Sequence, residues 1–307
     1  MGRRIAVLGA LAAVAAGAVA WLVLRAGPPL PAGLAGGLAF VSDRDGIPAL
    51  YWRRLPGDRE RRLTFGSEAV GEPAVSPDGT RVAFSMNGRL GVVAVATGEE
   101  RILTFGVDWK DATPAWLPDG VRLVVSARRP GEPAGLHLLE PAAEGRATRH
   151  PLTQPRREDD TSPTPSPDGA FVVFVRDGHL FRVALADGQT RRLTGGFRNE
   201  RSPRFLPDGR LVCAWSEGKS HGIDALDADG GGRHTLVEGP IVYRTLAPSP
   251  DGRFLAATFS HDLAFRPLRA LLPRQTEEVR LLGLDGRELA RLESSLWHTS
   301  HSPDWGH

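Results

Sequence analysis

The chain has 307 residues, a length that accommodates one large domain or two of ordinary size. Three of its 38 basic residues and none of its 36 acidic residues precede residue 38, so the rest of the chain is close to neutral, which argues against binding to nucleic acid. With Cys213 as its single cysteine, the sequence excludes an intrachain disulfide and a cysteine-based zinc cluster.

The N-terminal segment, residues 1–25, is predicted to be a signal anchor or a signal peptide. Residues 5–24 are uncharged, and as a helix they would be ~30 Å long, the thickness of the hydrocarbon core of a bilayer. Two arginines precede this stretch and one follows it, so the positive-inside rule places the remaining chain outside the cytoplasm. Residues 18–20 (AVA) also fit a signal-peptidase site, which leaves cleavage and secretion open.

Residues 26–37 are rich in Pro, Gly and Ala and are predicted to be a linker, because they cannot bury an apolar face. The folded domain is expected over residues 38–307. We therefore expect a single-pass protein of the cytoplasmic membrane, with its domain on the periplasmic or cell-surface side.

One tetrapeptide, S-P-D-G or a close variant, recurs through this domain. Its six copies lie at 76–79, 117–120, 166–169, 206–209, 249–252 and 302–305. Proline presets φ at the first corner of a turn, aspartate bonds to the backbone that follows, and glycine tolerates the exit conformation, so each copy predicts a turn between two strands. The copies are 40 to 53 residues apart, close to the ~40–45 residue period of four-stranded propeller blades.

The strands and chain ends predict how the blades stack and close. The five runs that follow the first five copies are apolar on both faces, as expected of blades that stack on neighbours at either side. The sixth copy has almost no chain after it, whereas residues 38–64 hold three predicted strands without a preceding turn. The two ends should therefore complete one blade, giving an all-β, six-bladed β-propeller with interlocked closure. The charged segment 153–165 is predicted to be a surface loop inserted between blades.

The S-P-D-G turn, the A-F type strand after it and a recurring R-L-T ending resemble the TolB-like and WD-repeat-like β-propeller repeat family over nearly all of residues 38–307. The resemblance implies the architecture. It does not imply one activity, because the family includes translocation-associated binding proteins, propellers fused to peptidases and stand-alone domains.

Polar residues precede the innermost strand of each predicted blade, where they would ring one mouth of the central channel. These candidates are Glu72, Asp111, Asp160, Glu200, Arg201, Arg244 and His298. Such a ring could bind a small polar ligand or a peptide segment of an envelope protein, although solvated loops would have the same composition. The preferred hypothesis is a membrane-tethered, non-catalytic binding scaffold that needs no cofactor and no metal.

The alternative is a propeller enzyme of the lyase, cyclase or glycosidase type, which would use acids among Asp111, Asp160 and Glu200, together with His298. A G-x-S-x-G match at 218–222 is a weak signal for a nucleophile, because the residues after it predict a strand where a nucleophile elbow needs a helix. The H-x-x-H at 298–301 is a weak metal signal, because residues three apart on a strand point to opposite faces. Alignment to the sixth tetrapeptide instead places His301 in the blade interior, at the position of Val75 and Trp116.

Overall fold

The S-P-D-G turns set the order of the strands. The computed structural model describes residues 30–57, 59–105, 108–142, 146–155, 157–260, 277–293 and 300–306. In the first turn, Ser76 Oγ and the backbone N–H of Thr80 donate to Asp78 Oδ1 at 2.6 and 3.0 Å. Equivalent bonds form in the turns that begin at Ser166 and Ser249. The predicted turn chemistry is therefore confirmed in these copies.

The described residues form 24 strands in six four-stranded antiparallel sheets, the blades. Blade 1 combines the C-terminal strand with the first three strands: β24 (Ser300–Gly306), β1 (Gly36–Ser42), β2 (Ala49–Leu55) and β3 (Arg61–Arg62). Blade 2 contains β4 (Val70–Val75), β5 (Arg81–Met86), β6 (Arg89–Ala94) and β7 (Glu100–Ile102). Blade 3 contains β8 (Lys110–Trp116), β9 (Leu123–Arg128), β10 (Gly135–Glu140) and β11 (Thr148–Pro151).

Blades 4 to 6 repeat this order along the chain. Blade 4 contains β12 (Thr161–Pro165), β13 (Phe171–Arg176), β14 (His179–Ala184) and β15 (Thr190–Arg192). Blade 5 contains β16 (Asn199–Phe205), β17 (Leu211–Glu217), β18 (Ser220–Leu226) and β19 (His234–Gly239). Blade 6 contains β20 (Val242–Pro248), β21 (Phe254–Ser260), β22 (Glu277–Gly283) and β23 (Glu288–Glu293).

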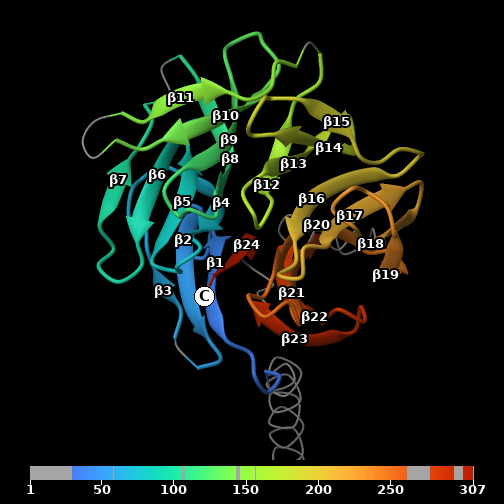
Figure 1. Ribbon diagram of the computed structural model, residues 1–307. Helices are drawn as coiled ribbons and strands as arrows, with labels where there is room; N and C mark the ends of the chain where they lie inside the picture. The colour runs from blue at the N-terminus through green and yellow to red at the C-terminus, as the bar shows by residue number, and fades with distance from the viewer. Residues whose placement is uncertain are drawn as a thin grey trace, which may run out of the picture.

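The blades surround a central channel, and the first strand of each blade in the order above lies innermost (Figure 1). Each innermost strand contacts the innermost strand of the next blade, and β20 contacts β24, which contacts β4, so the ring is closed. Figure 1 shows the two ends of the colour range, β1 in blue and β24 in red, side by side in one sheet. The predicted six-bladed propeller and its interlocked closure are confirmed.

The sixth tetrapeptide is not a turn, and this prediction is wrong. Residues 302–305 lie inside β24, where Trp305 pairs with Leu38. In blade 2 the second pair after the register shift joins Val75 to Val82, and in blade 1 the second pair after the shift joins Trp305 to Leu38. Trp305 therefore occupies the position that the alignment had assigned to His301. The error arises because Ser302-Pro303 matches the start of S-P-D-G, although its counterpart in blade 2 is Glu72-Pro73, within the innermost strand.

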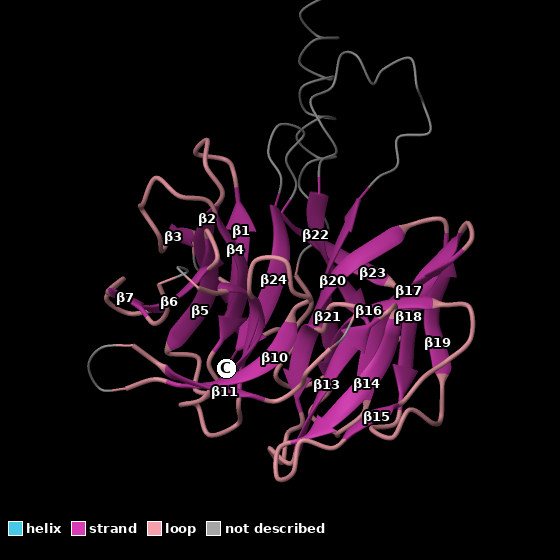
Figure 2. Cartoon of the chain, turned by 90° about the horizontal axis from the view of Figure 1, so that it is seen from above, coloured by secondary structure: helices cyan, strands magenta, loops and turns pink. Residues whose placement is uncertain are grey.

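The hydrophobic core consists of the layers between blades, which Figure 2 shows as stacked sheets. Of the described residues, six buried clusters form, one at each blade interface. In β5, for example, Val82 and Phe84 face blade 1 while Ala83 faces blade 3. Burial of both strand faces, predicted from the apolar runs, is therefore confirmed.

The recurring Leu-Thr ending has a structural cause. Thr64, Thr104 and Thr194 each accept a hydrogen bond through Oγ1 from a backbone N–H of the third strand of their blade, at 2.9 to 3.0 Å. Thr153 makes the same contact with Leu136 N at 2.8 Å. The threonine hydroxyl thus takes the place of a backbone carbonyl as the acceptor for the third strand, at the point where the outermost strand ends.

Two predictions about segments outside the blades have different outcomes. The charged segment 153–165 is a surface loop only in part, because β12 occupies Thr161–Pro165 and Thr153 is buried. The predicted anchor, residues 5–24, lies outside the described part of the chain, and none of the described residues belongs to a helix long and apolar enough to cross a membrane.

Candidate functional site

A bulge interrupts each innermost strand near its middle and turns one residue of the strand into the channel. The register of all six innermost strands shifts at this place. The bulged residue has a positive φ in four consecutive blades: 50° at Glu72, 44° at Thr113, 51° at Ser162 and 49° at Ser202. A proline follows each of them in the sequence. The same β-bulge therefore recurs around the wall of the channel.

The bulges surround a cavity of about 150 Å³, which we call the arginine pocket. Its walls consist of the bulged residues, the prolines beside them and three arginines: Glu72, Pro73, Thr113, Pro114, Ser162, Pro163, Arg201, Ser202, Arg204, Arg244, Thr245 and Pro303. Of the seven residues predicted from sequence as candidates, three therefore line one cavity: Glu72, Arg201 and Arg244.

Arg201 is held in this wall by neutral groups. Its Nη1 donates to the backbone O of Tyr243 at 3.0 Å, and its Nη2 donates to Ser216 Oγ at 2.6 Å. Arg244 stands at the same distance before the turn of the next blade, where it is itself the residue at which the register shifts. Burial, followed by the positive charge of Arg244, lowers the pKa of Arg201.

Glu72 joins blade 2 to blade 3 across the same cavity. Its Oε2 accepts the backbone N–H of Thr113 at 2.9 Å and the hydroxyl of Ser85 at 3.1 Å. The Thr113 hydroxyl is buried and makes no hydrogen bond within the described chain. Three arginines and one carboxylate therefore line this cavity.

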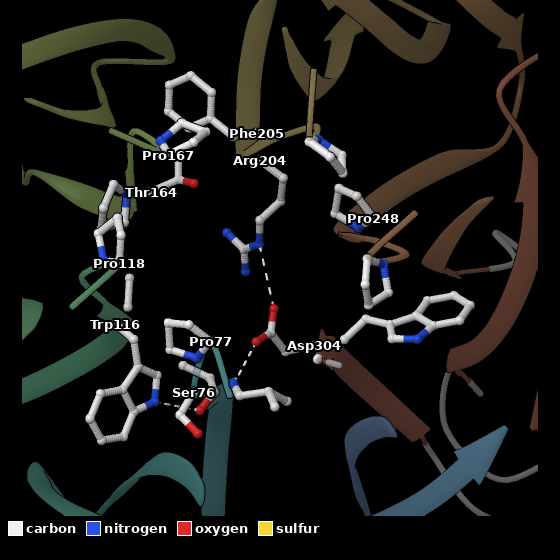
Figure 3. Close-up of a pocket in the computed structure, with 18 of the residues that line it drawn as sticks. Ser76, Pro77, Trp116, Pro118, Thr164, Pro167, Arg204, Phe205, Pro248 and Asp304 are labelled. Carbon is white, nitrogen blue, oxygen red and sulfur yellow. Dashed lines mark hydrogen bonds and ion pairs between the residues drawn. The ribbon is translucent and has the colours of Figure 1, made fainter. Parts of the chain in front are cut away.

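A second cavity of about 450 Å³, the proline pocket, lies at the turn end of the channel. The prolines of the five turns line it: Pro77, Pro118, Pro167, Pro207 and Pro250. In Figure 3 the Arg204 side chain points into this cavity toward Asp304, and their Nε and Oδ1 atoms are 3.9 Å apart. Asp304 Oδ2 also accepts the Val75 N–H at 2.6 Å. Burial raises the pKa of Asp304, although Arg204 acts in the opposite direction.

The other predicted acids are buried inside their blades. Asp111 accepts two bonds from Arg149 Nη2 at 2.7 and 2.8 Å. Asp160 accepts two bonds from Arg176, at 2.6 Å from Nε and 2.8 Å from Nη2. Each carboxylate is 2 % exposed or less, so burial without its arginine would be costly.

Glu200 is the third buried acid, 1 % exposed, and it contacts Arg233 and the Thr194 hydroxyl. Arg233 also binds Asp224, which Arg198 contacts as well, at 2.6 and 2.5 Å. The acids proposed for an enzymatic site thus form ion pairs in blades 3, 4 and 5, and none of them lines the arginine pocket. His298 lies outside the described residues.

The comparisons with known proteins agree with the architecture. No family model matches the chain. A TolB homolog from Chlorobium luteolum is 31% identical over 160 residues, which are 50% of this chain and 35% of that protein. The structure of TolB from Acinetobacter baumannii matches with a TM-score of 0.72 at 16% identity, over 91% of this chain and 68% of that chain. The chain is a TolB-like six-bladed β-propeller.

A structure of oligogalacturonate lyase in complex with manganese also matches the TolB-like propeller, with a TM-score of 0.61 at 17% identity, over 85% of this chain and 75% of that chain. At this identity the likeness is one of fold. Within the part of the chain that the structure describes, no three His, Cys, Asp or Glu residues come together as metal ligands.

The G-x-S-x-G match lies in an ordinary hairpin of this TolB-like propeller. Ser220 begins β18, and its hydroxyl donates to Glu238 Oε1 at 2.7 Å on the neighbouring strand. The strand predicted to follow this motif is confirmed. His221 Nδ1 lies 2.7 Å from Ser216 Oγ, so this histidine contacts a different serine.

Sequence reasoning missed Thr113, Arg204 and Asp304 as channel residues. Arg204 and Asp304 occupy the same repeat position, two residues after the bulged residue of their strands. The signal that could have found them is the recurring X-Pro of the bulge, at 72–73, 113–114, 162–163, 202–203 and 302–303. Aligning the repeat on this dipeptide, and not only on the turn, places all three in the wall.

Proposed function

We propose that this TolB-like propeller is a membrane-tethered, extracytoplasmic scaffold that binds an envelope protein or a small polar ligand in its central channel, without catalysis. One observation carries the proposal. Five blades direct polar side chains into one small cavity, whereas the acids suited to a propeller enzyme are bound by arginines inside the blades. A cavity lined by a few convergent polar groups is typical of a ligand site.

Exposed aromatic residues support a protein partner. Phe65, Phe105 and Phe197 are 73%, 46% and 93% exposed, and each lies in a loop that leads from an outermost strand to the innermost strand of the next blade. These loops reach the channel where the innermost strands begin, which is the end nearer the arginine pocket. Exposed apolar side chains on the loops at one end of a protein are common at protein-binding surfaces.

The tether rests on residues 5–24 and on the path of the chain after them. Leu30 packs on the cluster between blades 1 and 6, and Gly33 lies beside the Arg253 side chain, next to the turn at 249–252. With a membrane span ending at residue 24, the turn side of the propeller would lie nearer the bilayer. The arginine pocket, at the other end of the innermost strands, would then face outward toward a partner.

The test is chemical crosslinking of the full-length protein in intact cells, followed by mass spectrometry of captured proteins. The variants Glu72→Ala and Arg244→Ala alter the arginine pocket, while Arg191→Ala removes an exposed arginine on the outermost strand of blade 4. We expect an envelope protein to be recovered with the wild type and Arg191→Ala and lost with both pocket variants. Recovery that is equal for all four proteins would refute binding through the channel.

Localisation has its own measurement. We expect alkaline carbonate to leave the protein in the membrane fraction and protease added to spheroplasts to degrade the propeller. Release into the soluble fraction would refute the tether, and protection from protease would refute the extracytoplasmic location.

A further inference from the structure

We propose that a cleft between blades 2 and 3 binds a small aromatic carboxylate, whose ring lies on the apolar floor of the cleft and whose carboxylate contacts Arg81 and Arg101. We call this cavity the interblade cleft. It shares no residue with the arginine pocket, so the inference goes beyond the proposed function.

The interblade cleft has a volume of about 210 Å³ and an apolar floor. The side chains that form this floor are Val92, Ala94, Leu103, Trp116 and Pro141. Leu103 and Trp116 belong to the buried cluster between blades 2 and 3, whereas Val92 and Ala94 are half-buried. The cleft is therefore reached from solvent and offers an apolar surface inside.

The cleft arises because blade 2 has a short side chain where other blades have a large one. In blade 1 the register position of Val92 belongs to Trp52. The Trp52 ring lies over Gly37, where an added Cβ would come within 1.8 Å of it. In blade 4 the same position belongs to Arg182, whose guanidinium lies 5.0 Å from the centroid of the Phe171 ring. Valine at position 92 leaves this space unfilled.

Arg81 is placed over the cleft by contacts with the neighbouring blade. Arg122, at the same position after the turn of blade 3, binds the aspartate of its own turn, with Nε 2.6 Å from Asp119 Oδ2. Arg81 Nη2 instead donates to the backbone O of Gly120 at 2.6 Å. The Arg81 guanidinium also lies 4.8 Å from the centroid of the Trp116 ring. Neutral groups therefore orient Arg81 beside the apolar floor.

The aspartate of the blade 2 turn compensates Arg81 only weakly. Asp78 Oδ1 accepts hydrogen bonds from Ser76 and Thr80, and Asp78 forms no ion pair with Arg81. The bond from the Ser76 hydroxyl is the largest cause that lowers the pKa of Asp78 to about 2, and the charge of Arg81 is the smallest. Most of the Arg81 charge is thus available to a ligand.

The other charged residues at the rim of the cleft are Arg101 and Glu99, both exposed. Arg101 donates to the backbone O of Ala142, and within the described chain neither Arg101 nor Glu99 forms an ion pair. Two arginines and one carboxylate give the rim a net positive charge, which favours an anion. Planar guanidinium groups bind carboxylates through paired N–H donors, so a carboxylate fits this rim.

The floor and the rim together select the ligand. An indole in the floor favours an aromatic ring over a polar body, because aromatic pairs are stabilised beyond the area that they bury. The volume of about 210 Å³ limits the ligand to a small molecule. A single ring that carries one carboxylate meets all three conditions.

The probe is phenylacetate, with phenylacetamide as its neutral match in shape and acetate as the anion without a ring. Binding to the full-length protein is measured by calorimetric titration and saturation-transfer NMR. We expect saturable binding of phenylacetate, and binding at least about tenfold weaker for the other two compounds. Equal affinity for phenylacetamide would refute recognition of the charge, and equal affinity for acetate would refute recognition of the ring.

Two variants locate the site. Arg81→Gln should weaken phenylacetate binding about tenfold or more, while Arg122→Gln, at the matched position in blade 3, should bind as the wild type does. Val92→Phe fills the cleft and should abolish binding, which keeps the inference testable if Arg81→Gln misfolds. Denaturant titration checks that each variant is folded. Unchanged affinity in a folded Val92→Phe protein would place the ligand elsewhere.

Glu99→Gln tests the sign of the ligand charge. Because it removes the acid of the rim, it should strengthen phenylacetate binding about twofold, the size expected for an exposed charge. Added salt should reduce this gain, since it screens exposed charges. Weaker binding in Glu99→Gln would show that Glu99 attracts the ligand, and would overturn the assignment to an anion.

A protein C-terminus that ends in phenylalanine carries the same two groups, a ring and a carboxylate. N-acetyl-glycyl-glycyl-phenylalanine represents it, and the amidated peptide is the control. We expect this peptide to bind more weakly than phenylacetate, because the cleft is limited to a small molecule. Tighter binding of the free peptide, lost on amidation, would overturn the assignment to a small acid.

Discussion

His137 in β10 is a buried histidine whose surroundings oppose its protonation. It is 5% exposed and meets the Trp109 ring edge-on, with ring centroids 4.6 Å apart. Burial, followed by the nearby positive charge of Arg149, lowers its pKa from 6.5 to about 4, although Asp111 acts in the opposite direction. The imidazole is therefore neutral in the folded protein at neutral pH.

This pKa predicts a loss of stability in mild acid. Between pH 6.5 and about 4 the unfolded chain takes up a proton at His137 and the folded protein does not, so the free energy of unfolding falls as pH falls. The fall attributable to this group approaches about 3 kcal/mol near pH 4. It is measured by urea denaturation of the wild type and His137→Gln at several pH values. The difference between the two should shrink over this range, while the exposed His234→Gln should follow the wild type; parallel curves for wild type and His137→Gln would contradict the prediction.

The sequence predicted the position of the acidic residues better than their surroundings. Asp111, Asp160 and Glu200 share one offset from the turn, and the structure places Asp111 in β8, Glu200 in β16 and Asp160 directly before β12. Their arginine partners come from strands further along the chain, such as Arg149 on β11 and Arg176 on β13. No local sequence pattern predicts these ion pairs, because they depend on how the strands of the blade are arranged.

The bulge in each innermost strand gives the channel its polar wall at a cost in backbone strain. Thr113 is β-branched, yet its φ is 44°, a conformation that such residues rarely adopt. Asparagine tolerates this region more readily because of its short polar side chain. Strain of this kind is commonly retained at binding sites, where it places a side chain usefully.

Thr113→Asn should therefore raise the free energy of unfolding by about 1 kcal/mol, because it relieves part of this strain. Thr245 is the matched control: it stands at the same repeat position in blade 6, and it is not among the residues with positive φ. Thr245→Asn should give no gain, since it also loses the 2.8 Å bond to Thr258. Denaturant titration compares the two. A gain at Thr245, or a loss at Thr113, would show that the bulge is not strained.

The repeat period made the number of blades and their closure predictable. Turn chemistry is local, so the five S-P-D-G copies mark the strands correctly even though the blades differ in length. The last segment was placed in the wrong register because Ser302-Pro303 resembles a turn and a bulge equally. Only the pairing of β24 with β1 decides between them, and that pairing joins residues from opposite ends of the chain.

Closure of the ring depends on Trp305, which the corrected register brings to the position of Trp116. Both side chains are 8% exposed, and both indoles donate to a backbone carbonyl: Trp116 to Ala74 at 2.9 Å and Trp305 to Ala35 at 3.1 Å. The first bond joins two blades that follow one another in sequence. The second ties the C-terminal strand to the residues that precede β1, and so holds the two ends of the chain together.

Trp116→Ala and Trp305→Ala should each lower the free energy of unfolding by about 3–5 kcal/mol, the usual cost of removing a buried tryptophan. The two losses should differ in where the structure loosens. In Trp305→Ala, amide hydrogen exchange should accelerate in both β24 and β1, because the ring has no covalent connection between those strands and opening there frees both edges. In Trp116→Ala the faster exchange should remain within blades 2 and 3. Identical exchange patterns in the two variants would mean that closure is no weaker than any other interface of the ring.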